Sequence, residues 1–233
     1  MDKSDTPNSH QLIMDSLKEK AGVKIDAYRN LELAFTDLKS ILKLMEASIR
    51  KEVRKFDKRV VVKFIDRGPF DAEFRISDDI LIFTMHTDIY TFDQSHSLWK
   101  TSYVKENNIR AFCGMISVYN FITDSFNYNR YNDVGYLIAR LFVNKESHFF
   151  VEGKRQLGFL YNDFERSKLE KNALRSVVES SILYSLNFDI YTPPFEQVKI
   201  LSVQEVFEKN LARMVKTGKR LGFKFQTDSQ GLE

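Results

Sequence analysis

Cysteine, glycine and proline are all scarce in this chain of 233 residues. The single cysteine, Cys113, excludes an intramolecular disulfide and any metal site built from several cysteines. Nine glycines and four prolines exclude collagen-like and linker-rich architectures. No apolar run reaches the roughly 18–20 residues that span a bilayer, and residues 1–15 lack the basic start and apolar core of a secretory signal. These absences predict a cytoplasmic protein with no membrane partner.

Apolar and aromatic residues, by contrast, are plentiful. Hydrophobic residues make up 43% of the chain and aromatic residues 13%. This composition excludes wholesale disorder and suffices for one sizeable core. We therefore expect a single α+β domain over residues 24–224. A flexible leader with a short helix over 1–23 should precede it, and a frayed tail over 225–233 should follow it.

A long helix is predicted over residues 24–57. Apolar residues recur there at alternating steps of four and three, which is the spacing of a coiled-coil seam. The residues of this seam are Leu31, Phe35, Leu38, Leu42, Met45 and Ile49. The helix would be long for a globular protein, whose helices average about 11–12 residues. We therefore expect it to dock against a partner helix, either in a second copy of the chain or among its own C-terminal helices.

Downstream of this helix the apolar periodicity changes to that of strands. Between residues 59 and 161, short alternating segments bounded by turn residues predict an antiparallel sheet of roughly six to eight strands. In one of these segments, Phe74 and Ile76 alternate with Glu73 and Arg75. Because successive strand residues point to opposite faces, we expect the first pair in the core and the second pair in solvent.

Two helices are predicted over residues 167–218. Each begins with a Ser-x-x-Glu capping box, one at Ser167 and one at Ser202. Because helices come at both ends of the chain and strands in the middle, a β-α-β parallel sheet is disfavoured. The sequence thus predicts the α+β class: an antiparallel β-sheet core with a long N-terminal helix and two C-terminal helices.

The most enzyme-like pattern is Asp66 followed by Glu73-Phe-Arg75. This spacing resembles that of PD-(D/E)xK nucleases, in which an Asp and a Glu on adjacent strands hold a divalent metal that activates water. The resemblance implies a metal-dependent site at Asp66 and Glu73. His86 is a further candidate, because it shares a strand face with Asp88. Against this, Arg75 stands where those nucleases have lysine, and an arginine cannot act as a neutral base.

Other catalytic motifs are absent from the sequence. It contains no GxGxxG, GxxxxGK[ST], GxSxG or HExxH segment, which removes the commonest nucleotide-binding, hydrolase and zinc-protease interpretations. Cys113 lies in an apolar run that is typical of a buried thiol. We therefore expect no cofactor and no metal, and the sequence favours a non-catalytic protein over an enzyme.

Basic residues cluster in segments 50–63 and 209–224. Such clusters suit a polyanion, although lysines and arginines near helix ends also simply complement the helix dipole. The aromatic and basic loop 126–131 is able to stack on bases, to contact a protein or to fold back over the sheet. The candidate nucleic-acid-binding residues are Lys51, Arg54, Lys55, Lys58, Arg59, Tyr128, Arg130, Tyr131, Lys216, Lys219 and Arg220.

The sequence leaves three functions open. The first is a non-catalytic intracellular interaction or accessory protein that forms a homodimer through its N-terminal helix. The second is a nucleic-acid-associated protein that uses the basic segments 50–63 and 209–224. The third is a nuclease-like enzyme at Asp66 and Glu73. We rank them in this order because catalytic motifs are absent and the helical seam is the strongest pattern.

Overall fold

A computed structural model describes residues 8–154, 156–188, 194–200 and 202–204. It begins with one long helix, which runs from α1 (Ser9–Ser16) through a π-helical segment, η1 (Leu17–Ala21), into α2 (Gly22–Val53). The leader helix predicted within 1–23 and the long helix after it are therefore continuous. Gly22, at the start of α2, keeps a helical backbone with a φ of −57°.

Six antiparallel strands form the sheet, and each pairs with the next one along the chain. The strands are β1 (Val62–Asp66), β2 (Asp71–Ile76), β3 (Asp79–Met85), β4 (Cys113–Ile122), β5 (Tyr136–Asn144) and β6 (Phe149–Gly153). The sheet is thus a simple meander. The predicted α+β class with an antiparallel sheet and a long N-terminal helix is confirmed.

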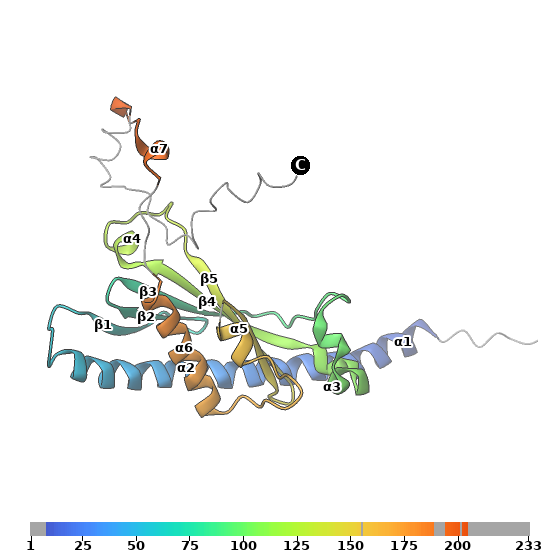
Figure 1. Cartoon of the computed structure of the whole chain (residues 1–233). Helices are drawn as coiled ribbons and strands as arrows, with labels where there is room; N and C mark the ends of the chain where they lie inside the picture. Colours follow the sequence, from blue (N-terminus) through green and yellow to red (C-terminus); the bar gives the residue numbers. More distant parts are fainter. Residues whose placement is uncertain (1–7, 155, 189–193, 201, 205–233) are drawn as a thin grey trace, which may run out of the picture.

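The long helix α2 lies along one face of the sheet, with α6 (Lys171–Leu186) beside it (Figure 1). The apolar seam of α2 faces the sheet, where Leu38 and Leu42 share one core with Phe74 and Leu141. Its neighbouring seam residues Leu31, Phe35 and Met45 are buried in the same core. The seam is therefore covered by the chain's own sheet and by α6. Its heptad-like spacing predicted a partner helix and did not indicate that the sheet is the main partner.

Short helices cover one end of the opposite sheet face. They are η2 (Ser97–Lys100), α3 (Ser102–Glu106) and η3 (Asn108–Ala111). Beneath them lies a second apolar cluster, in which the rings of Phe142 and Phe150 stack at 4.9 Å. This small layer covers only one end of that face, and the short helix α4 (Thr123–Asn127) packs on the same face near the end of β4 through Phe126 and Phe121.

The chain after β6 departs from the sequence-based expectation in two places. The sheet ends at Gly153, because the chain turns into α5 (Gln156–Leu160). Ser167 does not cap a helix, because its carbonyl accepts a hydrogen bond from the backbone of Phe149 (3.0 Å) and α6 begins later. The described part ends with α7 (Phe195–Val198) and residues 202–204, so most of the helix predicted from Ser202 lies outside the described residues. No helix in these ranges is long and apolar enough to cross a membrane.

We expect Phe74→Ala to lower the free energy of unfolding by about 3–5 kcal/mol, because Phe74 is completely buried between the sheet and α2. Phe159→Ala is the matched control, since the ring of Phe159 on α5 is exposed and should change stability by less than about 0.5 kcal/mol. Urea unfolding of both variants measures the difference. Equal losses in the two variants would contradict the observed strand register.

Candidate functional site

The two carboxylates of the nuclease-like pattern lie on opposite faces of the sheet. Asp66 ends β1 on the side of α2, where Lys39 Nζ donates to its Oδ1 at 2.6 Å. This hydrogen bond holds the pKa of Asp66 below its ordinary value. Glu73 points the other way, because its neighbour Phe74 packs toward α2. The predicted metal site therefore does not form, and no group of three His, Cys, Asp or Glu side chains among the described residues could hold a metal ion.

Glu73 is not the solvated residue that the strand alternation predicts: its side chain is 0% exposed. Arg67 Nε donates to Glu73 Oε2 at 2.7 Å, and Arg75 donates to Oε1. Two guanidinium groups compensate the hydration that a buried carboxylate loses. Glu73 therefore serves as the centre of an ion-pair cluster on β2, with its charge already satisfied.

His86 lies just after β3, on the sheet face opposite α2, and contacts a serine and a tyrosine. Its Nε2 is 3.0 Å from Ser117 Oγ, and its Nδ1 is 3.4 Å from the Tyr90 hydroxyl. The first distance is that of a base beside a nucleophile. However, Ser117 is only 2% exposed, so a substrate cannot reach its hydroxyl. The structure thus places His86 in a polar contact between β3 and β4.

Cys113, the remaining candidate nucleophile, begins β4 and is completely buried. Burial raises the pKa of its thiol well above the ordinary range, which disfavours the thiolate that nucleophilic attack requires. The prediction of a buried structural thiol is confirmed.

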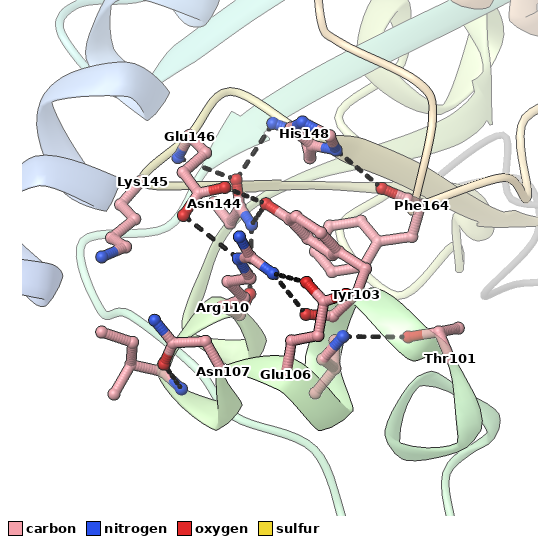
Figure 2. A network of polar contacts seen from close by, with 12 residues as sticks. Thr101, Tyr103, Glu106, Asn107, Arg110, Asn144, Lys145, Glu146, His148 and Phe164 are labelled. Atoms are coloured by element: carbon pink, nitrogen blue, oxygen red, sulfur yellow. Dashed lines mark hydrogen bonds and ion pairs between the residues drawn. The ribbon is translucent and has the colours of Figure 1, made fainter.

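An extended polar network joins α3 and η3 to the turn between β5 and β6 (Figure 2). The hydroxyl of Tyr103 donates to Glu146 Oε2 at 2.8 Å and accepts from the side-chain amide of Asn144 at 3.0 Å. Arg110 donates to Glu146 Oε1 at 3.2 Å, and its guanidinium lies 4.3 Å from the centre of the Tyr103 ring. The imidazole of His148 stacks on the same ring at 4.5 Å.

The same turn is also tied to the long helix. The side-chain amide of Asn30 in α2 donates to the backbone carbonyls of Asn144 (3.1 Å) and Lys145 (2.8 Å). The network therefore connects α2, the sheet and the covering helices. Sequence reasoning missed it because its partners lie far apart in the chain, as Tyr103 and Glu146 do, and no local spacing signals such contacts.

Burial and hydrogen bonding shift the pKa of Glu146, the acid of this network, in opposite directions. Burial raises the pKa of Tyr103, which keeps its hydroxyl a donor. Burial would also raise the pKa of Glu146, but the hydrogen bonds from Tyr103 and Arg110 outweigh it, so the pKa of Glu146 lies below its ordinary value of 4.5. These contacts are made within the chain, which indicates a structural role for the network.

We expect Glu146→Gln to reduce the acid sensitivity of the fold. Because the folded-state pKa of Glu146 is depressed, its contribution is complete above its ordinary pKa and is lost as the pH falls through the folded-state value. Wild type should therefore lose more stability than the variant between about pH 6 and about pH 3, by no more than about 1 kcal/mol for this partly exposed group. Glu106→Gln, at a more exposed acid that also pairs with Arg110, is the control. Urea unfolding across this pH range measures the effect, and identical acid sensitivity of wild type and Glu146→Gln would contradict it.

The basic segment 50–63 covers the end of α2, the link that follows it and the start of β1. Its five candidate residues, Lys51, Arg54, Lys55, Lys58 and Arg59, are all exposed. The second basic segment, 209–224, lies outside the described residues, and so do Lys216, Lys219 and Arg220.

The aromatic loop 126–131 includes the end of α4 (Thr123–Asn127) and divides into inward and outward side chains. Phe126 packs edge-on against Phe121 with ring centres 5.5 Å apart, so part of the loop folds back over the sheet. Tyr128 and Tyr131 are exposed. Arg130 is only 7% exposed and lies 3.1 Å from Asp133, so we remove Arg130 from the residues that could contact nucleic acid.

The N-terminal part of the long helix projects beyond the sheet (Figure 1). Residues 8–20 are all exposed, and the first buried residue of the helix is Val23. One side of this projection forms an apolar groove along the helix. It is lined by Leu12, Ile13, Ser16, Leu17, Lys20, Ala21 and Lys24.

Comparison of the chain with family models, curated proteins and solved structures gives no match.

Proposed function

We propose that the protein is a non-catalytic interaction protein that self-associates through the projecting part of its N-terminal helix. The observation that carries this proposal is the apolar groove on α1 and η1, which lies on the part of the long helix beyond the sheet. Leu12, Ile13 and Leu17 are each more than half exposed there. Exposed apolar side chains gathered on one face are typical of an interaction site.

The candidate catalytic side chains support a non-catalytic role. The charge of Glu73 is neutralised by two arginines, Ser117 is buried, and Cys113 is buried with a raised pKa. Each of them would have to move out of its present contacts before it could act on a substrate.

Charge complementarity favours a second copy of this chain, packed antiparallel, as the partner. If the axis of symmetry passes between Ser16 and Leu17, Leu12 lies opposite Ala21 of the second copy. Asp15 then lies opposite the second copy's Lys18, so that the symmetric contact contains two such ion pairs. A parallel pairing would instead bring identical charges together at Lys20.

The contact would be small. The projection of residues 8–20 is about 20 Å long at 1.5 Å per residue. A single helix pair of this length gives an interface at the weak end of the range for specific complexes, so we expect a dissociation constant on the order of micromolar.

We expect sedimentation equilibrium to show a mass that rises from 27.4 kDa toward twice that value as protein concentration increases. Leu17→Glu should keep the protein monomeric, because it places a charge in the groove opposite the second copy's Ser16. Since Leu17 is exposed in the monomer, the variant should keep the wild-type melting temperature.

Met14→Glu is the matched control, because Met14 lies on the same helix but outside the groove. It should associate as wild type does. A wild-type protein that stays monomeric at about 100 micromolar, well above the expected dissociation constant, would contradict the proposal. So would a Leu17→Glu variant that associates as strongly as Met14→Glu.

A further inference from the structure

The opposite end of the long helix carries exposed positive charge that the described part of the chain does not neutralise. Segment 50–63 contains seven basic and two acidic residues, a net charge of +5. Three of its basic residues are already paired: Arg50 with Glu46, Lys55 with Glu52, and Arg59 with Asp57. The remaining four, Lys51, Arg54, Lys58 and Lys63, are exposed and make no ion pair with any described residue. Helix-dipole compensation needs charge only within the last turn, so it does not explain Lys58 and Lys63.

Hydrogen bonds bring the loop after β4 to the same end of the sheet. The backbone N–H of Ser77 donates to the carbonyl of Val61 (2.9 Å), and the N–H of Thr123 donates to the carbonyl of Asp78 (2.8 Å). Val61 leads into β1 and Thr123 follows β4 directly, so three strand spacings, about 14 Å, separate the two backbones. The basic segment and the loop that holds Tyr128 and Tyr131 therefore adjoin the same end of the sheet, the first at the end of α2 and the second beyond α4 (Figure 1).

One exposed aromatic ring lies in the basic segment and another in the loop after β4. Phe56, within the basic segment, is 77% exposed, and Tyr131, in the loop, is 86% exposed. Neither ring stacks on another aromatic ring of the described residues. A ring this exposed stabilises the fold little, but it offers a flat surface on which a base can stack.

Exposed acidic residues of this end lie beside the loop that holds the tyrosines, whereas its exposed cations belong to the basic segment. Asp78 and Asp124 are exposed beside the loop, where they repel phosphate groups. The cations of segment 50–63 lie before and after Val61, next to the edge strand β1. A chain of phosphates would therefore follow the basic segment, while its unpaired bases reach the tyrosines.

We infer that this end of the molecule binds single-stranded nucleic acid without sequence preference, with Lys51, Arg54 and Lys58 contacting phosphates and Tyr131 stacking on a base. Duplexes suit the site less, because their bases are stacked on one another and cannot reach an exposed ring. The inference is independent of self-association, since the groove on α1 and η1 lies at the other end of the helix.

Fluorescence anisotropy of labelled oligothymidylate and oligouridylate tests the inference, with a duplex of equal length and a polyglutamate peptide as the other ligands. We expect both single strands to bind at low salt, more tightly than the duplex and the peptide. Affinity should fall steeply as salt is raised, because phosphate neutralisation releases counterions.

Two pairs of variants separate charge from stacking. Lys58→Glu should weaken binding of all anionic ligands and lower the salt dependence, whereas Lys105→Glu, the same charge change at an exposed position of α3, should not. Tyr131→Ala should weaken only single-strand binding, by about 5- to 150-fold if one base stacks on the ring. Phe159→Ala, which removes an equally exposed ring from α5, should have no effect.

Three results would overturn the inference. The first is no binding of single strands by micromolar protein at low salt. The second is equal binding of single strand and duplex with no loss in Tyr131→Ala, which would indicate a charge-only site. The third is tighter binding of polyglutamate than of either oligonucleotide, which would indicate an acidic protein partner instead.

Discussion

The packing of the apolar side of α2 against the sheet is the interaction on which the rest of the structure depends. Leu31, Phe35 and Leu38 lose nearly all their exposure to water in this contact, and burial of each such side chain stabilises the fold by about 1.5–3 kcal/mol. Gly114 in β4 allows the helix to come close, because a Cβ there would lie 2.7 Å from a methyl carbon of Leu31. The Asn30 hydrogen bonds to the β5–β6 turn then fix the helix along its axis.

A helix longer than the sheet it covers has ends that the sheet cannot bury, and the two ends of this one differ in chemistry. The N-terminal projection over residues 8–20 is amphipathic, with an apolar groove flanked by charges of both signs. The C-terminal end over residues 50–63 is basic and carries an exposed ring at Phe56. The candidate catalytic groups between them are paired or buried. This distribution is why we propose binding at the ends of the helix and no chemistry on the sheet.

The sequence predicted the α+β class with a long N-terminal helix and an antiparallel sheet, because these follow from local periodicity. It missed α5, which lies where the sheet was expected to continue. The alternation around Phe74 identified its strand and its core face correctly. The seam from Leu31 to Met45 correctly indicated a buried helix face, but the same spacing suits a sheet and a partner helix equally, so it could not identify what covers it. The burial of Glu73 was missed although its partners Arg67 and Arg75 are close in sequence, because strand alternation assigns Glu73 to the face away from the main core and does not show that this face is covered there. The Tyr103–Glu146 contact was missed because it joins residues far apart in the chain. The exposure of Tyr131 and the burial of Arg130, one residue apart, were equally invisible to composition and pattern.

Hydrogen exchange of the long helix, measured at two protein concentrations, tests the central claim that the sheet covers the apolar residues of α2 while the apolar residues of the N-terminal projection await a second copy of the chain. We predict that the amides of residues 31–45 exchange slowly at both concentrations, since the sheet covers them in each molecule. The amides of residues 9–20 should exchange rapidly in dilute protein and become protected as the concentration rises above the micromolar range. Rapid exchange of residues 9–20 at both concentrations would contradict the account, and so would protection that does not depend on concentration.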